Sequence, residues 1–234
     1  MFERPHHQKI AHVLKALDAD RLSSYRCYFG GGTSIALRFG EYRESVDIDF
    51  LISDPAGYRE LRHLLTGSQG LKPITRASTQ PLLLVRDIRA DQYGIRTIVQ
   101  MDGQKIKFEI VREARIDLET PGLRDQICSV STMTTLDLAT SKLLANSDRY
   151  ADDSVFSRDL IDLGMMDLSR KELCGALEKA EQAYGPSVTR DLTRAIECLQ
   201  GRKGWLDRCM LAMGISLPKA QVWAKIRRVK RILP

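Results

Sequence analysis

The chain reads Gly30-Gly31-Gly32-Thr33-Ser34 and, after a short helix and a turn, Ser45-Val46-Asp47-Ile48-Asp49-Phe50. The glycines predict a turn that opens a helix, and the backbone N–H groups of Gly32 and Thr33 at its start can hold a phosphate. Alternation in the second stretch predicts a strand with Asp47 and Asp49 on one face and the apolar residues on the other. Together the two stretches indicate a site for a nucleoside triphosphate and a divalent metal.

A third acid lies in a later β-rich run, Lys105-Ile106-Lys107-Phe108-Glu109-Ile110. The alternation places Glu109 and Lys107 on the face away from the apolar residues. If this strand is close to the strand of the two aspartates, three carboxylates converge. Two carboxylates about 4 Å apart repel by roughly 4 kcal/mol at an effective dielectric of 20, so such a cluster needs a cation. Oxygen-only ligands favour Mg²⁺ or Mn²⁺, which predicts metal-dependent phosphoryl or nucleotidyl transfer.

Each motif alone also has a plainer interpretation. An Asp-x-Asp pair at a strand end is often a solvated edge. The glycine turn is not a P-loop, because no Gly-Lys-Ser/Thr follows, and it lacks the third glycine of the G-x-G-x-x-G dinucleotide fingerprint. The combination of both motifs with Glu109 favours the catalytic interpretation.

The pattern of expected elements changes near residues 115–130. Before that point β-rich runs alternate with helices, and Asp102-Gly103 predicts a two-residue hairpin turn. From residue 132 onward the chain is almost wholly helical in pattern, with helices expected at 134–148, 157–168, 169–184 and 187–199. The sequence therefore predicts an α+β protein in two domains: residues 1–120 as a mixed sheet with flanking helices, and residues 121–234 as a helical domain.

Composition limits the class of protein. Of the 234 residues, 43% are hydrophobic and 28% are charged, which is ordinary for a folded globular chain. The five cysteines are scattered without a C-x-x-C pair, as expected of reduced thiols. No apolar run approaches the roughly 20 residues needed to span a bilayer. We therefore expect a soluble cytoplasmic protein without a membrane partner.

The net charge of +6 is concentrated in the last stretch of the chain. Residues 219–231 contain six cations and no acid, which equals the whole excess. The apolar residues of the same stretch recur at the spacing of one helical face: Val222, Ile226, Val229 and Leu233. A docking helix with a solvated basic face and a contact with a nucleic-acid backbone are both open interpretations.

The motifs also occur in a recognisable order along about residues 25–165. They are Gly31-Gly32-Thr33, Arg43-x-Ser45-x-Asp47-Ile48-Asp49-Phe50, Phe108-Glu109-Ile110, Ser141-Lys142-Leu143-Leu144-Ala145 and Arg158-Asp159-Leu160-Ile161-Asp162-Leu163. This set resembles the polymerase-beta-like nucleotidyltransferase superfamily, and specifically the AbiEii-type nucleotidyltransferase toxins of bacterial abortive-infection and toxin–antitoxin systems, relatives of the MenT toxins. The resemblance implies a polymerase-beta-like core followed by a C-terminal helical bundle.

The resemblance also implies a role for each matched residue. Asp47, Asp49 and Glu109 are expected to hold Mg²⁺ or Mn²⁺ and, with Lys142 and Asp159, to form the catalytic set. The expected nucleotide-binding residues are Gly31, Gly32, Thr33, Arg43, Ser45 and Lys142. The implied reaction moves a nucleotide from an NTP to an acceptor hydroxyl of RNA, with the 3′ end of tRNA as the expected acceptor. A cognate antitoxin protein is the expected partner.

Other interpretations stay open beside this one. The chain could bind nucleotide or RNA in the same fold without turnover, or transfer the nucleotide to a small molecule or a protein. For Lys142 the plain alternative is a solvated helix lysine. For Asp159 it is an acid favoured in the first turn of a helix by the helix dipole.

Overall fold

The computed structural model describes residues 2–233 and divides into two compact units. The first unit comprises residues 2–41 and 45–134, and the second comprises residues 42–44 and 135–233. The first unit ends at residue 134 rather than at the expected residue 120. The reason is that two short strands after residue 120 contact elements of the first unit: β6 (Gln126–Ile127) and β7 (Val130–Ser131). The predicted α+β class, with a mixed sheet and C-terminal helices, is confirmed.

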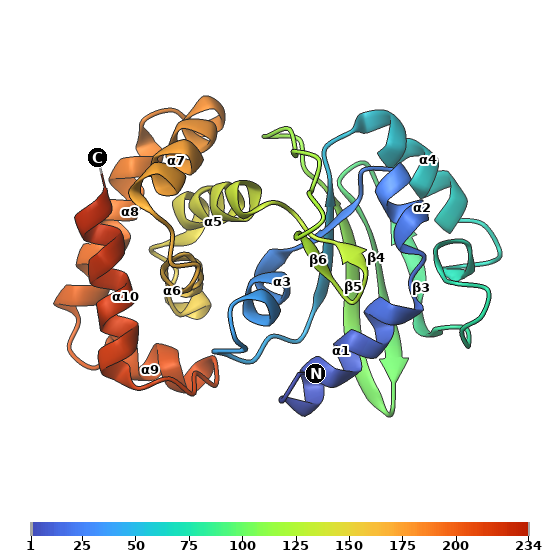
Figure 1. Ribbon diagram of the computed structural model, residues 1–234, viewed down its shortest axis with the longest axis horizontal. Helices are drawn as coiled ribbons and strands as arrows, with labels where there is room; N and C mark the ends of the chain where they lie inside the picture. The colour runs from blue at the N-terminus through green and yellow to red at the C-terminus, as the bar shows by residue number, and fades with distance from the viewer. Residues whose placement is uncertain (1, 234) are drawn as a thin grey trace. The chain divides into compact units, whose positions relative to one another are not determined.

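The first unit contains a mixed sheet to which β3, β4 and β5 belong (Figure 1). The sheet has five strands in the order β1-β2-β5-β4-β3. The strands are β1 (Tyr28–Gly30), β2 (Ile48–Ile52), β3 (Leu83–Ala90), β4 (Gly94–Met101) and β5 (Gln104–Arg112). The strands β2 and β5 pair in parallel, and the other pairs are antiparallel. The predicted Asp102-Gly103 turn joins β4 to β5 with positive φ at both residues, as a tight hairpin requires.

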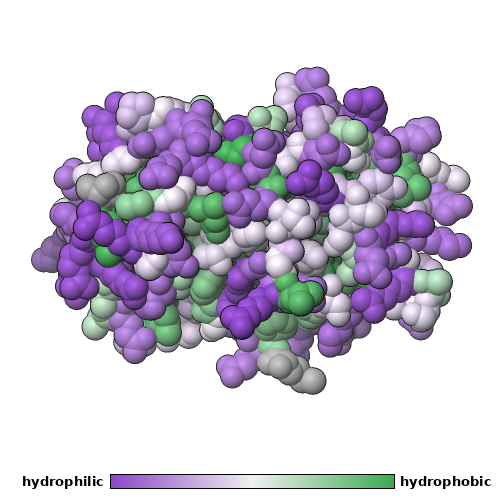
Figure 2. Space-filling view, turned by 45° about the horizontal axis from the view of Figure 1, so that its top comes forward, coloured by the Kyte–Doolittle hydropathy of each residue, from purple (hydrophilic) through white to green (hydrophobic). Residues whose placement is uncertain are grey.

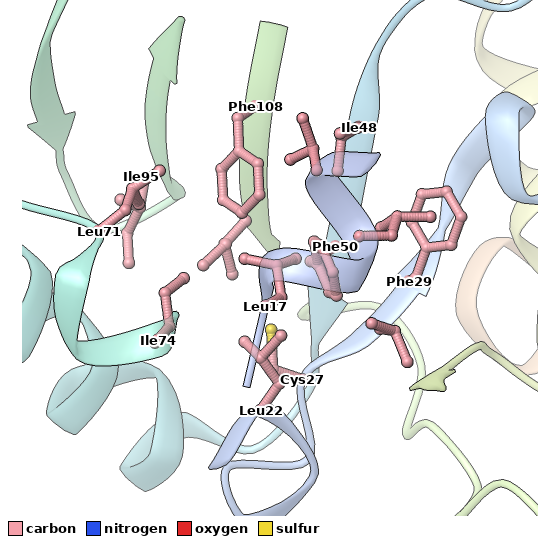
Figure 3. Close-up of a cluster of buried hydrophobic side chains, with 14 of the residues drawn as sticks. Leu17, Leu22, Cys27, Phe29, Ile48, Phe50, Leu71, Ile74, Ile95 and Phe108 are labelled. Carbon is pink, nitrogen blue, oxygen red and sulfur yellow. The ribbon is translucent and has the colours of Figure 1, made fainter. Parts of the chain in front are cut away.

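Helices of the first unit cover one face of this sheet. They are α1 (Pro5–Ala16), α2 (Ala19–Ser24), α3 (Gly31–Arg38), α4 (Pro55–Leu65) and the 3₁₀ turn η1 (Lys72–Ile74). Apolar residues of α1, α2 and α4 form one core with alternate residues of β2 and β5. Phe50 lies at its centre, 5.6 Å from the Phe29 ring and 5.7 Å from the Phe108 ring between centroids (Figure 3). The strand residues between these core positions therefore face the opposite side of the sheet.

The second unit is helical, as predicted. Its elements are α5 (Thr135–Arg149), η2 (Asp153–Val155), α6 (Arg158–Met165), α7 (Arg170–Tyr184), α8 (Ser187–Gly201), α9 (Trp205–Ala212) and α10 (Lys219–Ile232). The predicted capping box at the start of α7 is present, with Ser169 and Glu172 bonded reciprocally to backbone N–H groups. The helix α9 was not among the expected ranges.

The basic tail forms α10, and its apolar face is buried on the second unit. Val222 and Ile226 are fully buried, and Val229 is nearly so. Several of its cations form ion pairs within the unit: Lys219 with Asp207, and Lys225 and Arg228 with Asp167. The apolar face of the tail is thus docked, as the first interpretation predicts, and contact of its basic residues with a nucleic-acid backbone stays a prediction.

One face of the molecule is shown in Figure 2. Figure 2 shows hydrophilic side chains over most of the face that it presents, with apolar atoms in small patches between them. None of the helices within residues 2–233 has both the length and the apolar composition for crossing a bilayer. The five cysteines are all free thiols.

Candidate functional site

Asp49 and Glu109 lie side by side on the sheet face opposite the core. Asp49 is the register partner of Glu109 in the parallel β2–β5 pair, and both side chains are half-buried. Their neighbours Ile48, Phe50 and Phe108 are buried in the core, as the alternation predicts. Asp47, also half-buried, directly precedes β2. The expected closeness of the two acidic strands is confirmed.

Two cations accompany these acids. The Lys107 Nζ lies 2.7 Å from Glu109 Oε2, and the Arg96 Nε lies 3.3 Å from Glu109 Oε1. Partial burial lowers the pKa of Lys107, but its bond to Glu109 and the charges of Asp47 and Asp49 outweigh that effect and raise it above the ordinary value. The three carboxylates therefore favour the charged form of Lys107.

The metal prediction is only partly matched by this geometry. Within residues 2–233, no three His, Cys, Asp or Glu side chains are gathered closely enough to hold a metal ion, so the three-carboxylate centre is not confirmed. Of the three predicted carboxylates, the strand register pairs Asp49 with Glu109. The donor chemistry of this pair fits Mg²⁺ or Mn²⁺, because these ions need only one or two carboxylates and complete their shell with phosphate and water oxygens. Metal binding by these residues stays a prediction.

The glycine turn lies directly against Asp49. Gly30 ends β1 as the register partner of Asp49, and Gly31 then begins α3 with φ of +67°. A Cβ atom on Gly31 would lie 2.5 Å from Asp49 Oδ2, so only glycine allows this close approach. Gly32 and Thr33 follow in the first turn of α3, whose N-cap, Gly30, has no side chain to cap it. The positive end of a helix dipole thus lies beside the carboxylates, where a phosphate would also be stabilised.

Thr33 and Ser45, both predicted to bind nucleotide, are brought together. The Thr33 Oγ1 and Ser45 Oγ atoms are 2.8 Å apart. The Ser45 N–H donates to His7 Nε2 at 3.1 Å, and His7 Nδ1 lies 2.7 Å from Glu41 Oε1. Because Nε2 accepts, the His7 proton lies on Nδ1 and is donated to Glu41. No local spacing in the sequence indicates these contacts of His7, since its partners lie more than thirty residues away.

We expect Gly31→Ala to displace Asp49 and to destabilise the first unit. A left-handed alanine costs about 1–2 kcal/mol, and the contact with the carboxylate adds to that cost. Gly40→Ala is a matched control, because Gly40 has φ of +85° but a Cβ added there would meet nothing within 4 Å beyond its chain neighbours. Thermal unfolding should show a larger loss for Gly31→Ala than for Gly40→Ala. Equal losses would contradict the close approach to Asp49.

A second charged cluster lies within the helical unit. The Lys142 Nζ contacts Asp159 Oδ1 at 2.9 Å and Asp162 Oδ2 at 2.7 Å. Arg149 binds Asp159 through two hydrogen bonds of 2.7 and 3.0 Å. Arg43 binds Asp162 in the same bidentate way, at 2.7 and 2.9 Å. We call these five residues the buried charge network.

Burial makes this network different from a surface ion-pair cluster. The Lys142 side chain is 8% exposed and that of Asp162 is 0% exposed, so Lys142 is not the solvated lysine of the plain interpretation. Burial alone would raise the pKa of Asp162, but Arg43 and Lys142 hold it well below the ordinary value. The pKa of Asp159 is likewise lowered, because Lys142 and Arg149 outweigh the effect of burial.

The predicted site residues therefore fall into two groups, one in each unit. The first unit holds Asp47, Asp49, Glu109, Gly31, Gly32, Thr33 and Ser45, and the second holds Arg43, Lys142 and Asp159. The guanidinium of Arg43 is occupied by Asp162, and a direct contact of Arg43 with nucleotide stays a prediction. No sequence spacing indicated the Arg43–Asp162 pair, which joins residues 119 positions apart.

Comparison with known proteins agrees with this geometry. A family model described as "Nucleotidyl transferase AbiEii toxin, Type IV TA system" matches residues 12–205. A Helicobacter pylori crystal structure, described as a candidate nucleotidyltransferase, is 15% identical over 97% of this chain and 94% of its own, with a TM-score of 0.51. JHP933 from the same organism is 15% identical over 99% of this chain and 96% of its own, with a TM-score of 0.46. No curated protein matches the sequence. At 15% identity, the similarity to the first of these structures is evidence for a similar fold and for nothing further.

Proposed function

Because this chain belongs to the AbiEii family of nucleotidyl transferase toxins of type IV toxin–antitoxin systems, we propose that it transfers a nucleotide from an NTP to an RNA hydroxyl. The 3′ end of tRNA is the proposed acceptor, and Mg²⁺ or Mn²⁺ the proposed cofactor. The observation that carries the proposal is the pairing of Asp49 with Glu109 beside the glycine turn. Carboxylates and a helix start at one place suit a substrate that combines phosphates with a divalent ion.

Each part of the first-unit site has a separate task in this reaction. The backbone N–H groups of Gly32 and Thr33 hold the triphosphate, and the Thr33–Ser45 hydroxyl pair borders it. Asp47, Asp49 and Glu109 provide carboxylate oxygens for the metal, which when bound stabilises charge on the phosphates. Glu109 also accepts a hydrogen bond from the attacking hydroxyl and takes its proton as the new bond forms. The hydroxyl oxygen bonds to the α-phosphorus, the bond from that phosphorus to the bridging oxygen breaks, and pyrophosphate leaves.

Within the second unit, we propose a catalytic role for Lys142 and Asp159 and a nucleotide-binding role for Arg43. Asp159 and Asp162 hold the Lys142 ammonium in position through the contacts described above. The proposed partner is a cognate antitoxin protein, since the family is that of a type IV toxin–antitoxin system. The cytoplasm, where NTP and tRNA both occur, is the proposed location.

The test is a transfer assay with each NTP in turn. Purified protein is incubated with total tRNA, Mg²⁺ and one labelled NTP, beside Asp49→Ala and a reaction containing EDTA. We expect label to enter RNA only with the unchanged protein and with Mg²⁺ present. Label on protein or on a small molecule would reject RNA as the acceptor. Tight nucleotide binding without any product would reject turnover.

A further inference from the structure

The sheet face that carries Asp49 and Glu109 continues across β4 to the edge strand β3. The register places four residues in one transverse row, because Asp49 pairs with Glu109, Glu109 with Arg96, and Arg96 with Arg89. Paired residues on neighbouring strands point to the same side of a sheet. The row therefore begins with two acids at the candidate site, continues with Arg96 on β4, and ends with Arg89 on the edge strand β3.

A second row runs parallel to the first. Lys107 pairs with Ile98, and Ile98 pairs with Arg86 of β3. Arg86, Arg89 and Lys107 are all exposed. We call Arg86, Arg89, Arg96 and Lys107 the basic strip. Because the core lies on the other side of the sheet, the basic strip lies on the same side as the carboxylates.

The cations of the basic strip differ in what they bind. Lys107 and Arg96 contact Glu109, and Arg96 also contacts Asp91 at 3.0 Å. Within the part of the chain that the structure describes, no ion pair involves Arg86 or Arg89. Arg89 is moreover the direct partner of Arg96, and like charges opposite each other destabilise a strand pair. An anion bound at the strip would relieve this repulsion.

The edge strand itself is shaped for an extended, charged ligand. Its pairing with β4 shifts register on both sides of Arg86, as at β-bulges, which re-aim side chains and disfavour pairing with another strand. Exposed apolar side chains accompany the arginines on β3 and in the turn after it: Leu83, Val85 and Tyr93. Cations interleaved with exposed apolar and aromatic surface are typical of sites for single-stranded nucleic acid.

We propose that the basic strip binds the backbone of the acceptor RNA near its reacting end. The phosphates lie over Arg86 and Arg89, and the chain end approaches Glu109 along the first row. Three strand spacings separate Arg89 from Asp49, a span of about 14 Å that suits the last few nucleotides. This inference rests on the proposed function, since it assigns a surface to the acceptor of that reaction.

The test compares two double variants with the same change of charge. Arg86→Ala/Arg89→Ala removes the edge of the strip, and Arg59→Ala/Arg194→Ala removes two exposed arginines elsewhere. Binding of a fluorescein-labelled single-stranded oligoribonucleotide is measured by anisotropy at several salt concentrations without NTP. We expect the strip variant to bind roughly tenfold more weakly, with a salt slope reduced by about 1.4, since each lost phosphate contact removes about 0.7. Equal effects in both double variants, or no RNA binding by the unchanged protein, would overturn the proposal.

Transfer kinetics separate this inference from the proposed function. In the transfer assay the strip variant should raise KM for RNA and leave KM for the NTP unchanged. Transfer to RNA with an unchanged KM in the strip variant would reject the strip alone. RNA binding that depends on the strip, without any transfer, would reject the proposed reaction alone. Thermal unfolding of both double variants checks that each is folded.

Discussion

Replacing Asp49 with alanine is expected to lower the rate of nucleotide transfer at least about a thousandfold, equivalent to about 4 kcal/mol in the barrier. The reason is the position of its carboxylate, which lies against Gly31 and beside Glu109. We expect a similar loss for Asp47→Ala and for Glu109→Gln. The measurement is single-turnover transfer of labelled nucleotide to tRNA.

Folding should be little affected by these substitutions. Glu109 contacts Lys107 and Arg96, whose side chains are 52% and 41% exposed, and exposed ion pairs contribute only about 0–1 kcal/mol. The melting temperature should therefore stay within a few degrees of the unchanged protein. Glu60→Ala, at an exposed position of α4, is the control and should keep full transfer. Loss of folding in Asp49→Ala would show a structural role instead, and full transfer would reject its place in the site.

Replacing Asp162 with asparagine should strongly destabilise the second unit. Asp162 is fully buried, and its loss of charge leaves Arg43 without a carboxylate partner. Lys142 then keeps only Asp159, which also binds Arg149. Breaking a buried pair on one side typically costs about 3–5 kcal/mol. Asp167→Asn is the matched control, because Asp167 also binds two cations but is 44% exposed. Urea unfolding should show a large loss for Asp162→Asn and a small one for Asp167→Asn, and equal losses would contradict the role of burial.

The same network predicts a pH dependence of stability. The pKa values of Asp159 and Asp162 are held below the ordinary value in the folded chain, so the unfolded chain binds more protons at acidic pH. Their contribution is complete above the unfolded pKa of about 3.9 and falls as the pH drops below it. Urea unfolding between pH 7 and pH 3 should show this loss, and a flatter profile is expected for Asp162→Asn.

Local patterns were enough to predict most of the first-unit site. Alternation alone put Asp49 and Glu109 on the faces away from the core, and the glycines marked the helix start. Local patterns could not predict that β2 and β5 are neighbours, because no spacing determines which distant strands pair. That expectation came from the family resemblance. Alternation placed Lys107 on the same face as Glu109. It does not determine the side-chain positions that bring the two into an ion pair.

Contacts between distant parts of the chain were beyond local patterns. His7 binds Ser45 across 38 positions, and Arg43 binds Asp162 across 119. The family resemblance made Arg43 a candidate nucleotide-binding residue, and nothing in the local sequence indicates its buried partner. The boundary near residue 120 was placed too early for a similar reason. The short strands β6 and β7 follow a loop that resembles a linker in composition, and only their contacts assign them to the first unit.

The assignment of residues 42–44 to the helical unit has a practical consequence for dissecting the molecule. A protein truncated after residue 134 would carry Arg43 without its carboxylate, and a peptide beginning at residue 135 would carry a buried Asp162 without its guanidinium. The later half alone would lack part of its interior, because Tyr42 and Arg43 are buried in it although they are encoded early in the gene. If the two halves are expressed separately and then mixed, Tyr42–Glu44 of the first piece must therefore pack into the second piece before the native contacts can form.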